Sequence, residues 1–363
     1  MTSALIHERI AKIRERLAAD QVDAFMITSA PNIQYMSGFS PSAPGDGTLL
    51  ITGDRALVIT DFRYYEQAER QAPDYTLYKL EKSFPAAFAE LVHEIGVHRV
   101  AFESAHVTCA LHQELAATEG LELVPFRDWV EDLRVIKTPE EIDLIRRAVA
   151  ISDAAIGALP EFLRPGMTEK QLAWELEAFM RTHGADEVSF SVIAAAGPNG
   201  AMAHAIPSDR PIVPGEPIVL DLGARVAGYC SDLTRTICLG EPGDELRRIY
   251  GIVLAAQETA EASIRPGMTG KEADAIARQV IADAGYGSNF GHGLGHGVGL
   301  EIHERPSVGP RSQERLEPGM VFSIEPGIYL QGWGGVRIED LAVVTEEGVD
   351  VLTRATKGPV LRR

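Results

Sequence analysis

The sequence predicts two domains: an α/β domain over residues 1–134 and an α+β domain over residues 135–363 that contains an internal repeat. Three observations support this division. The chain has 363 residues, more than the ~250–300 that one hydrophobic core usually serves. Helical and strand-like apolar patterns alternate through its first third. A five-residue segment, Arg-Pro-Gly-Met-Thr, occurs at residues 164–168 and again at residues 265–269.

The first domain begins with a predicted amphipathic helix, because four apolar residues recur at helical spacing: Ile6, Ile10, Ile13 and Leu17. Residues 24–27 then predict a short strand. Residues 29–40 are rich in turn-forming types and predict a loop that carries Tyr35 and Phe39. Two apolar runs within residues 49–59 flank Gly-Asp-Arg and predict a β-hairpin.

The alternation continues to about residue 125 without a convincing cluster of titratable side chains. Acids such as Glu103 are therefore interpreted as surface or capping residues. A domain boundary is expected near residue 135, because Thr138, Pro139 and Glu141 together have the pattern of a helix start with a capping box. The helix that follows carries an apolar stripe: Ile142, Ile145, Val149, Ile151 and Ile156.

The second domain is predicted to consist of two copies of one helix-plus-hairpin unit. Thr168 and Thr269 end the two Arg-Pro-Gly-Met-Thr segments and are candidate N-caps of amphipathic helices. Further along, a Pro-Gly pair precedes Asp221 by seven residues, and another precedes Glu325 by the same interval. Self-similarity at this scale predicts a pseudo-two-fold domain whose site lies on the axis between the copies.

Composition and charge exclude several classes of function. A formal net charge of -18 argues against a nucleic-acid or anionic-membrane partner, because both would be repelled. No apolar run approaches the ~18–20 residues of a membrane span, and no signal-peptide core is present. Cys109, Cys230 and Cys238 form no CxxC pair, so neither a disulfide framework nor a thiolate zinc site is expected. We therefore expect a cytoplasmic protein.

Four carboxylates lie in apolar, strand-like segments of the second domain: Asp221, Asp232, Glu325 and Glu339. A carboxylate in an apolar strand is costly unless something neutralises it, and a cation is the usual solution. Taken singly, each acid could cap a strand or pair with Arg235 or Arg337. Taken together, at positions that the repeat relates, they predict a centre for two metal ions.

A glycine-dense segment, residues 290–304, holds His292, His296 and His303, and His204 lies in a loop upstream. Glycine allows close approach to a ligand, and imidazole is both a common metal ligand and a proton carrier near neutral pH. Oxygen ligands with one imidazole favour manganese, cobalt, iron or zinc. Two such ions about 3.5–4 Å apart can activate water and polarise a carbonyl, which indicates a hydrolase.

The second domain resembles the pita-bread metallopeptidases, the family of methionine aminopeptidase, aminopeptidase P and prolidase. The resemblance lies in five segments in the family's order: residues 219–223, 229–236, 295–304, 323–327 and 337–340. It implies that Asp221 chelates one metal, that Asp232 and Glu339 bridge, and that His296 and Glu325 complete the other site. The family's ligand histidine precedes a second histidine by seven residues, which selects His296.

The resemblance extends to the first domain, which is similar to the creatinase N-terminal domain and points to the Xaa-Pro peptidase branch. It implies that His292, Tyr329 and Arg337 line the site or steady the substrate. It also implies that His204 faces the substrate and that His303 contacts the scissile carbonyl. In relatives, the loop matching residues 31–40 reaches the neighbouring subunit's site, which would give Tyr35 and Phe39 a substrate-binding role in a homodimer.

The sequence thus predicts a dinuclear-metal hydrolase that cleaves an Xaa-Pro bond at the N-terminus of peptides or in dipeptides. We expect two manganese ions, with cobalt, zinc or iron as alternatives, and Glu325 or a bridging acid as proton acceptor. Another amidohydrolase or lyase acting on a small non-peptide substrate stays open, because a fold does not fix its substrate. A non-catalytic binding module is a third interpretation. The sequence does not decide between dipeptidase and aminopeptidase.

Overall fold

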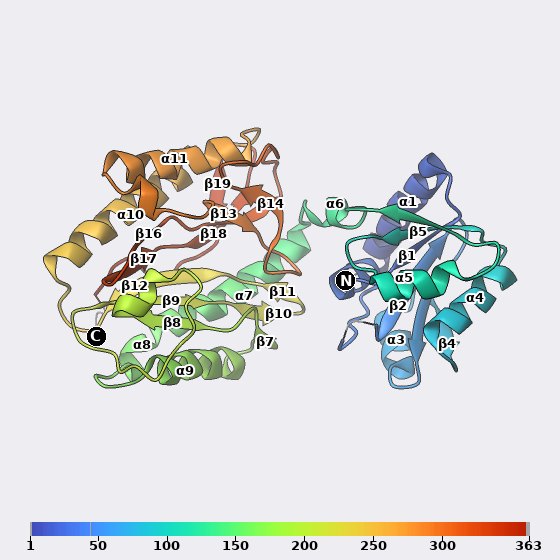
Figure 1. Ribbon diagram of the computed structural model, residues 1–363, viewed down its shortest axis with the longest axis horizontal. Helices are drawn as coiled ribbons and strands as arrows, with labels where there is room; N and C mark the ends of the chain where they lie inside the picture. The colour runs from blue at the N-terminus through green and yellow to red at the C-terminus, as the bar shows by residue number, and fades with distance from the viewer. Residues whose placement is uncertain (1, 44, 361–363) are drawn as a thin grey trace. The chain divides into compact units, whose positions relative to one another are not determined.

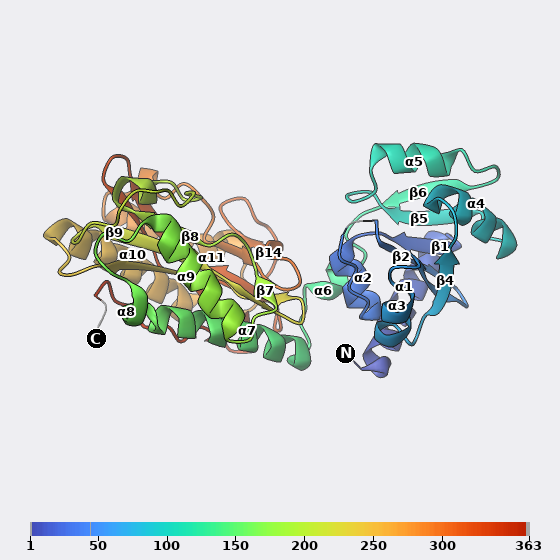
Figure 2. The same ribbon diagram turned by 90° about the horizontal axis from the view of Figure 1, so that it is seen from below.

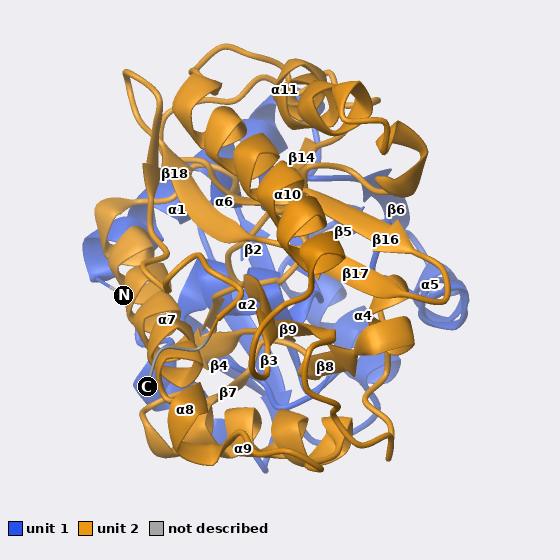
Figure 3. Cartoon of the chain, turned by 90° about the vertical axis from the view of Figure 1, so that its left-hand side faces the viewer, with its two compact units in different colours: residues 1–134 blue, residues 135–363 orange. Residues whose placement is uncertain are grey.

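The computed structural model describes residues 2–43 and 45–360 (Figure 1). The chain divides into two compact units, Met1–Arg134 and Val135–Arg363, which Figure 3 draws in different colours. Among the described residues, no helix has both the length and the apolar character that crossing a bilayer requires. All three cysteines are free, and Cys230 and Cys238 are buried.

Unit 1 is an α/β domain built on a six-stranded sheet of order β4-β3-β2-β1-β5-β6. Its strands are β1 (Ala24–Ile27), β2 (Gly47–Thr52), β3 (Ala56–Asp61), β4 (Thr76–Leu80), β5 (Arg99–Glu103) and β6 (Glu122–Phe126). Its helices are α1 (Ser3–Asp20), α2 (Ala30–Ser37), α3 (Tyr65–Gln71), α4 (Phe84–Glu94), α5 (Cys109–Ala116) and α6 (Glu131–Arg134). The predicted first helix, first strand and hairpin are confirmed, and the apolar stripe of α1 is buried.

The predicted loop over residues 29–40 is wrong, because Ala30–Ser37 form α2. Pro31 is tolerated in the first helical turn, where its missing N–H leaves no gap in the helix. The Tyr35 hydroxyl donates to the Leu133 carbonyl (2.9 Å), and the Arg9 guanidinium lies 3.5 Å above the Tyr35 ring centroid. Phe39 is fully buried. Both aromatic side chains therefore belong to the core of unit 1, and we propose no substrate-binding role for them.

Glu103 was interpreted as a surface or capping residue, and the surface interpretation is wrong because its side chain is buried. Glu103 is the last residue of β5 and is 5% exposed. Its carboxylate accepts hydrogen bonds from the Thr28 and Ser29 amides (2.6 and 2.8 Å) and from the Asn32 side chain (2.6 Å). Burial raises the pKa of Glu103. The Glu103 carboxylate therefore holds the turn between β1 and α2, a segment that is distant from Glu103 in sequence.

Unit 2 is an α+β domain whose strands are β7 (Glu187–Val188), β8 (Ile193–Ala196), β9 (Pro217–Leu222), β10 (Ala224–Val226), β11 (Tyr229–Cys230), β12 (Leu233–Cys238), β13 (Gly295–Gly297), β14 (Glu304–Val308), β15 (Val321–Ile324), β16 (Gly327–Leu330), β17 (Gly334–Arg337), β18 (Asp340–Val344) and β19 (Val349–Val351). Its helices are α7 (Pro139–Gly157), α8 (Leu159–Phe162), α9 (Glu169–Thr182), α10 (Asp244–Ser263) and α11 (Gly270–Asp283), with 3-10 turns η1 (Gly197–Ala201) and η2 (Gly287–Asn289). The strands lie between α9 on one side and α10 and α11 on the other (Figures 1 and 2).

The internal repeat of unit 2 is present in the structure. In the first half β9 pairs antiparallel with β12 around the hairpin β10–β11; in the second, β15 pairs with β18 around β16–β17. Thr168 and Thr269 each form a capping box, at the starts of α9 and α11. The predicted capping box at Thr138 also exists, at the start of α7. Each half has its own hydrophobic cluster.

Candidate metal centre

The repeat sets four carboxylates at equivalent places. Asp221 lies near the end of β9 and Glu325 just after β15, while Asp232 and Glu339 lie just before β12 and β18. His296 belongs to β13, which pairs with β15. Two paired hairpins therefore deliver the acids, and a neighbouring strand delivers the imidazole.

All five of these side chains line one cavity of about 480 Å³ in unit 2. The predicted residues His204, His292, His303 and Arg337 line the same cavity. Tyr329 is connected to this cavity by hydrogen bonds to two of the residues that line it, His292 and Arg337. The structure thus brings together every predicted site residue except Tyr35 and Phe39, which are buried in the core of unit 1.

Three of the groups have the spacing of metal ligands. Ligand atoms of Asp232, His296 and Glu339 all lie within 4.8 Å of one another. His296 Nε2 lies 3.5 Å from Asp232 Oδ2 and 3.4 Å from Glu325 Oε1. His296 Nδ1 lies 3.2 Å from the Gly297 carbonyl, which can only accept, so Nδ1 carries the hydrogen. Nε2 then presents its lone pair to the carboxylates.

Two buried carboxylate oxygens at this centre have no hydrogen-bond partner among the described residues: Asp221 Oδ1 and Glu339 Oε1. Burial, and then the charges of Glu339 and Asp221, raise the pKa of Asp232 well above its ordinary value. Burial and the charges of Glu325 and Asp221 do the same for Glu339. Such a cluster is unfavourable as bare carboxylates, and divalent cations supply both the missing charge and the missing partners. The residues present therefore fit metal ions.

The two arginines proposed as alternative partners of the acids account for only one of them. Arg235 pairs with Asp340 (2.7 Å), outside the cluster, and Arg337 pairs with Asp221 Oδ2 (2.5 Å). Within the described part of the chain, neither arginine forms an ion pair with Asp232 or Glu339. The interpretation by ion pairs alone is therefore insufficient for this centre.

Polar side chains that the sequence analysis did not select hold the acids in place. Thr234 donates to Glu339 Oε2 (2.6 Å) and accepts from Arg337 Nε (2.9 Å). Ser323 donates to Glu325 Oε1 (3.1 Å) and accepts from the His296 amide (3.1 Å). Thr234 lies two residues after Asp232, and Ser323 lies two residues before Glu325. Because alternate residues of a strand share a face, this spacing was the sequence signal that could have identified them. An apolar wall was also missed: Phe190, Ile193 and Ile302.

A hydrogen-bonded chain runs from Arg337 to His292. Arg337 Nη1 donates to the Tyr329 hydroxyl (3.0 Å), which lies 2.9 Å from His292 Nε2. His292 Nδ1 lies 2.8 Å from the Gly293 carbonyl and so carries the hydrogen, which leaves Nε2 as the acceptor of the Tyr329 proton. This chain fixes the orientation of His292 at the cavity.

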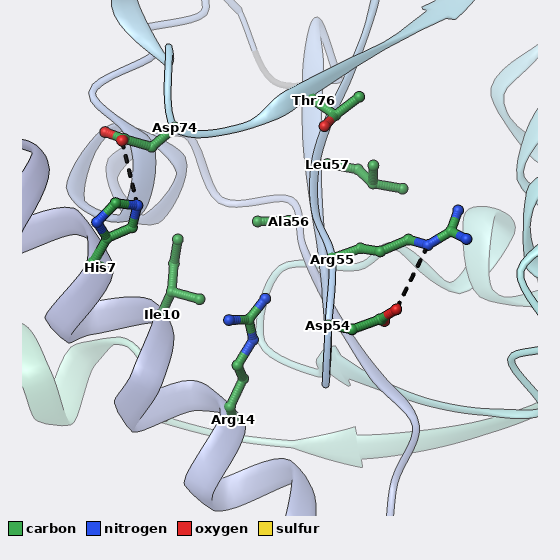
Figure 4. Close-up of a pocket in the computed structure, with 9 residues that line it drawn as sticks. All are labelled: His7, Ile10, Arg14, Asp54, Arg55, Ala56, Leu57, Asp74 and Thr76. Atoms are coloured by element: carbon green, nitrogen blue, oxygen red, sulfur yellow. Dashed lines mark ion pairs between the residues drawn. The ribbon is translucent and has the colours of Figure 1, made fainter.

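A second cavity, of about 570 Å³, lies in unit 1 among α1, the turn between β2 and β3, and the start of β4 (Figure 4). Most of its ionisable side chains pair with each other: His7 lies 3.4 Å from Asp74, and Arg55 lies 3.9 Å from Asp54, while Arg14 donates to the Thr52 carbonyl (2.9 Å). The exposed side-chain fractions of His7, Arg55 and Asp54 are 64%, 52% and 83%. This cavity therefore lacks the buried, unpartnered acids that mark the centre in unit 2.

Comparison with known proteins agrees with this geometry. A model described as "Metallopeptidase family M24" matches residues 143–346, and one described as "Creatinase/Prolidase N-terminal domain" matches residues 9–136. The chain belongs to metallopeptidase family M24. The predicted family, the pita-bread fold and the creatinase-type first domain are confirmed, and this M24 protein is an enzyme that uses divalent metal ions.

Several relatives match this M24 chain along nearly its whole length. It is 44% identical to an uncharacterized peptidase of Bacillus subtilis (96% of this chain, 98% of the relative) and 38% identical to a Xaa-Pro dipeptidase of Pyrococcus horikoshii (97% and 99%). A solved Xaa-Pro dipeptidase from Bacillus anthracis superposes with a TM-score of 0.94 at 42% identity (98% and 100%). An X-Pro aminopeptidase from Thermotoga maritima gives 0.89 at 37% identity (96% and 100%).

We expect manganese to stabilise this M24 chain against unfolding. Bound ions would relieve the repulsion among four buried carboxylates, and at 100 times the dissociation constant binding adds about 2.7 kcal/mol to the free energy of unfolding. Thermal unfolding of chelator-treated protein, with and without Mn²⁺, measures the change. Sodium chloride at the same ionic strength is the control, because an equal shift with sodium would show charge screening only.

Proposed function

We propose that this metallopeptidase cleaves the bond between a first residue and a proline at the second position of a peptide or dipeptide. The observation that carries the proposal is the pair of unpartnered carboxylate oxygens, Asp221 Oδ1 and Glu339 Oε1, in a cavity that four histidines also line. The names of full-length relatives, Xaa-Pro dipeptidase and X-Pro aminopeptidase, support the choice of substrate.

The metal ligands would be five residues: Asp221, Asp232, His296, Glu325 and Glu339. Asp232 and Glu339 suit the bridging positions, because each lies just before the second strand of its hairpin and both are close to His296. When bound, divalent ions lower the pKa of water and polarise a carbonyl. We propose two manganese ions, with cobalt, zinc or iron as alternatives for this donor set.

The chain's own residues would handle protons and orientation. Glu325 would accept the proton of the attacking water, since one oxygen is hydrogen-bonded by Ser323 at 3.1 Å and the side chain lines the cavity. His303, whose ring centroid lies 4.3 Å from that of His296, would donate to the oxygen of the scissile carbonyl as negative charge develops there. His204 and His292, which line the same cavity, would position the substrate.

The proline preference has a physical basis in the wall of the cavity. A Xaa-Pro bond has no amide hydrogen, so the site needs no acceptor at that nitrogen. Phe190, Ile193 and Ile302 line the same cavity as the acids and would pack against the pyrrolidine ring while excluding water. Arg337 donates to Asp221 and to the Ala203 carbonyl, which would keep this arrangement fixed.

We expect Ala-Pro to be hydrolysed in the presence of Mn²⁺ and Ala-Ala to be hydrolysed about 100-fold more slowly, because ring contacts with an apolar pocket supply that order of discrimination. Product formation followed by chromatography measures both rates. Cleavage of Ala-Pro-Ala at the same bond would show an aminopeptidase, and its absence a dipeptidase. Equal turnover of Ala-Ala and Ala-Pro would contradict the proposal.

An amidohydrolase or lyase with a small non-peptide substrate is less well supported, because relatives that match along the whole chain are named peptidases. The homodimer and the cytoplasmic location stay predictions. Sedimentation of the purified protein tests the first.

A further inference from the structure

The loop between β8 and β9, residues 197–216, carries His204 and is here called the His204 loop. The repeat gives it a counterpart, residues 298–320, because β8 and β13 each pair antiparallel with the first central strand of their half, β9 and β15. The His204 loop has twenty residues, and its counterpart has twenty-three and contains β14. Each loop brings a histidine to the cavity, His204 in the first half and His303 in the second.

Both loops are attached to the preceding helix start by the same backbone hydrogen bonds. In the first half the donors and acceptors are Ile212 N to Met167 O (2.8 Å), Glu169 N to Arg210 O (3.2 Å) and Lys170 N to Ser208 O (3.1 Å). In the second half they are Leu316 N to Met268 O (2.8 Å), Gly270 N to Glu314 O (2.9 Å) and Lys271 N to Ser312 O (3.0 Å). Because these hydrogen bonds join backbone atoms, they do not require a particular side chain at the first helical position.

The side chain at that position differs between the halves. In α11 it is Gly270, where an added Cβ would lie 2.2 Å from the Ser307 carbonyl oxygen, so no side chain fits. In α9 it is Glu169, which is fully buried. The second half shows that the repeat unit folds without a carboxylate here. Glu169 therefore makes contacts to its loop that Gly270 cannot make in the second half.

The Glu169 carboxylate is hydrogen-bonded on both sides of the segment of the loop that carries His204. Oε1 accepts from the Ala196 amide (2.7 Å), immediately before the loop. Oε2 accepts from the Asn199 side chain (2.8 Å) and from the Ser208 amide and hydroxyl (2.8 and 2.6 Å). Residues 200–207 thus form a short loop, and the residues that flank it, Asn199 and Ser208, are both hydrogen-bonded to the buried Glu169 carboxylate.

Residues 200–207 are also held from the cavity side, because Arg337 Nη1 donates to the carbonyl of Ala203 (3.0 Å), the residue before His204. We propose that Glu169 is a positioning residue, a buried clamp that sets the His204 loop so that His204 faces the metal centre. The effect on catalysis rests on the proposed function; the effect on the loop does not.

We expect Glu169→Gln to loosen the His204 loop without disturbing its counterpart. The amide nitrogen of glutamine would face either the Ala196 amide or the three donors at Oε2, so at least one buried donor loses its acceptor. Native-state hydrogen exchange should be at least about 10-fold faster at whichever amide loses its acceptor, Ala196 or Ser208, and unchanged over residues 309–320 of the counterpart loop. Unchanged exchange at both amides would overturn the clamp.

A double-mutant cycle tests whether Glu169 acts through His204. We expect Glu169→Gln to lower kcat/KM for Ala-Pro by about 10-fold or more, as small misplacements of a positioning group do. In the His204→Ala background the same change should lower kcat/KM by less than about 2-fold, because the group being positioned is gone. An equal loss in both backgrounds would indicate general destabilisation and overturn the proposal.

Two further variants complete the test. Glu272→Ala removes the capping side chain of α11 in the other half and should leave kcat/KM unchanged. Ser208→Ala removes one donor to Glu169 and should reproduce the exchange effect in weaker form if Glu169→Gln does not fold. Failure of the wild type to cleave any Xaa-Pro peptide would refute the proposed function, while the exchange measurement would still decide the clamp.

Discussion

Replacing Glu339 by alanine should abolish peptide hydrolysis, with turnover falling by on the order of 10³-fold or more, because the proposed role of Glu339 is to hold both of the ions that would activate the water. Glu339 is 2% exposed, one oxygen accepts from Thr234 at 2.6 Å, and the other is unpartnered. The metal-free variant should stay folded, because the substitution removes one member of a mutually repelling cluster. Steady-state assays, metal analysis and circular dichroism measure the three effects.

The matched control for this variant is Glu346→Ala, an exposed glutamate in the turn between β18 and β19, which should keep wild-type turnover and metal content. Retained hydrolysis in Glu339→Ala would remove this residue from the metal centre. Loss of hydrolysis with unchanged metal content would assign Glu339 a role other than that of a ligand.

Replacing the next residue, Asp340, by alanine should instead destabilise the whole unit, by about 3–5 kcal/mol, because it leaves the buried Arg235 without its counter-charge and removes one of the two carboxylates that pair with Lys357. Asp340 is fully buried and accepts from Arg235 (2.7 Å), Lys357 (2.7 Å) and Gln257 (2.9 Å). Although burial opposes ionisation, Arg235 and Lys357 hold the pKa of Asp340 below its ordinary value. Its stabilising effect is therefore present above that ordinary pKa and is lost as the pH falls through the lowered value.

Urea denaturation of metal-free protein at neutral pH measures this loss without a contribution from ions bound at the adjacent Glu339. The control is Asp350→Ala, which breaks a half-exposed pair with Arg146 (2.9 Å) and should cost about 0–1 kcal/mol. A similarly small loss for Asp340→Ala would show that Arg235 and Lys357 find other partners or water.

The predicted elements that proved correct depend on local chemistry. The stripe of α1, the hairpin of β2 and β3, and the capping boxes at Thr138, Thr168 and Thr269 require only residues close in sequence. The duplicated Arg-Pro-Gly-Met-Thr segment and the matched spacing to the acids also revealed the repeat. The error at residues 29–40 arose because proline and glycine were interpreted as loop formers, although Pro31 and Gly38 lie in the first turn and at the C-cap of a helix.

What the sequence by itself determined was the two-part architecture, the repeat and the identity of the acids and histidines, since apolar periodicity and residue chemistry are properties of short segments. Only the tertiary structure decided which carboxylates keep one oxygen without a partner among the described residues, as Asp221 and Glu339 do, and which have both oxygens bonded, as Asp340 does. It also decided that Tyr35 and Phe39 are core residues and that Glu169 closes the His204 loop. The physical reason is that burial and hydrogen-bond satisfaction depend on segments that meet only after folding.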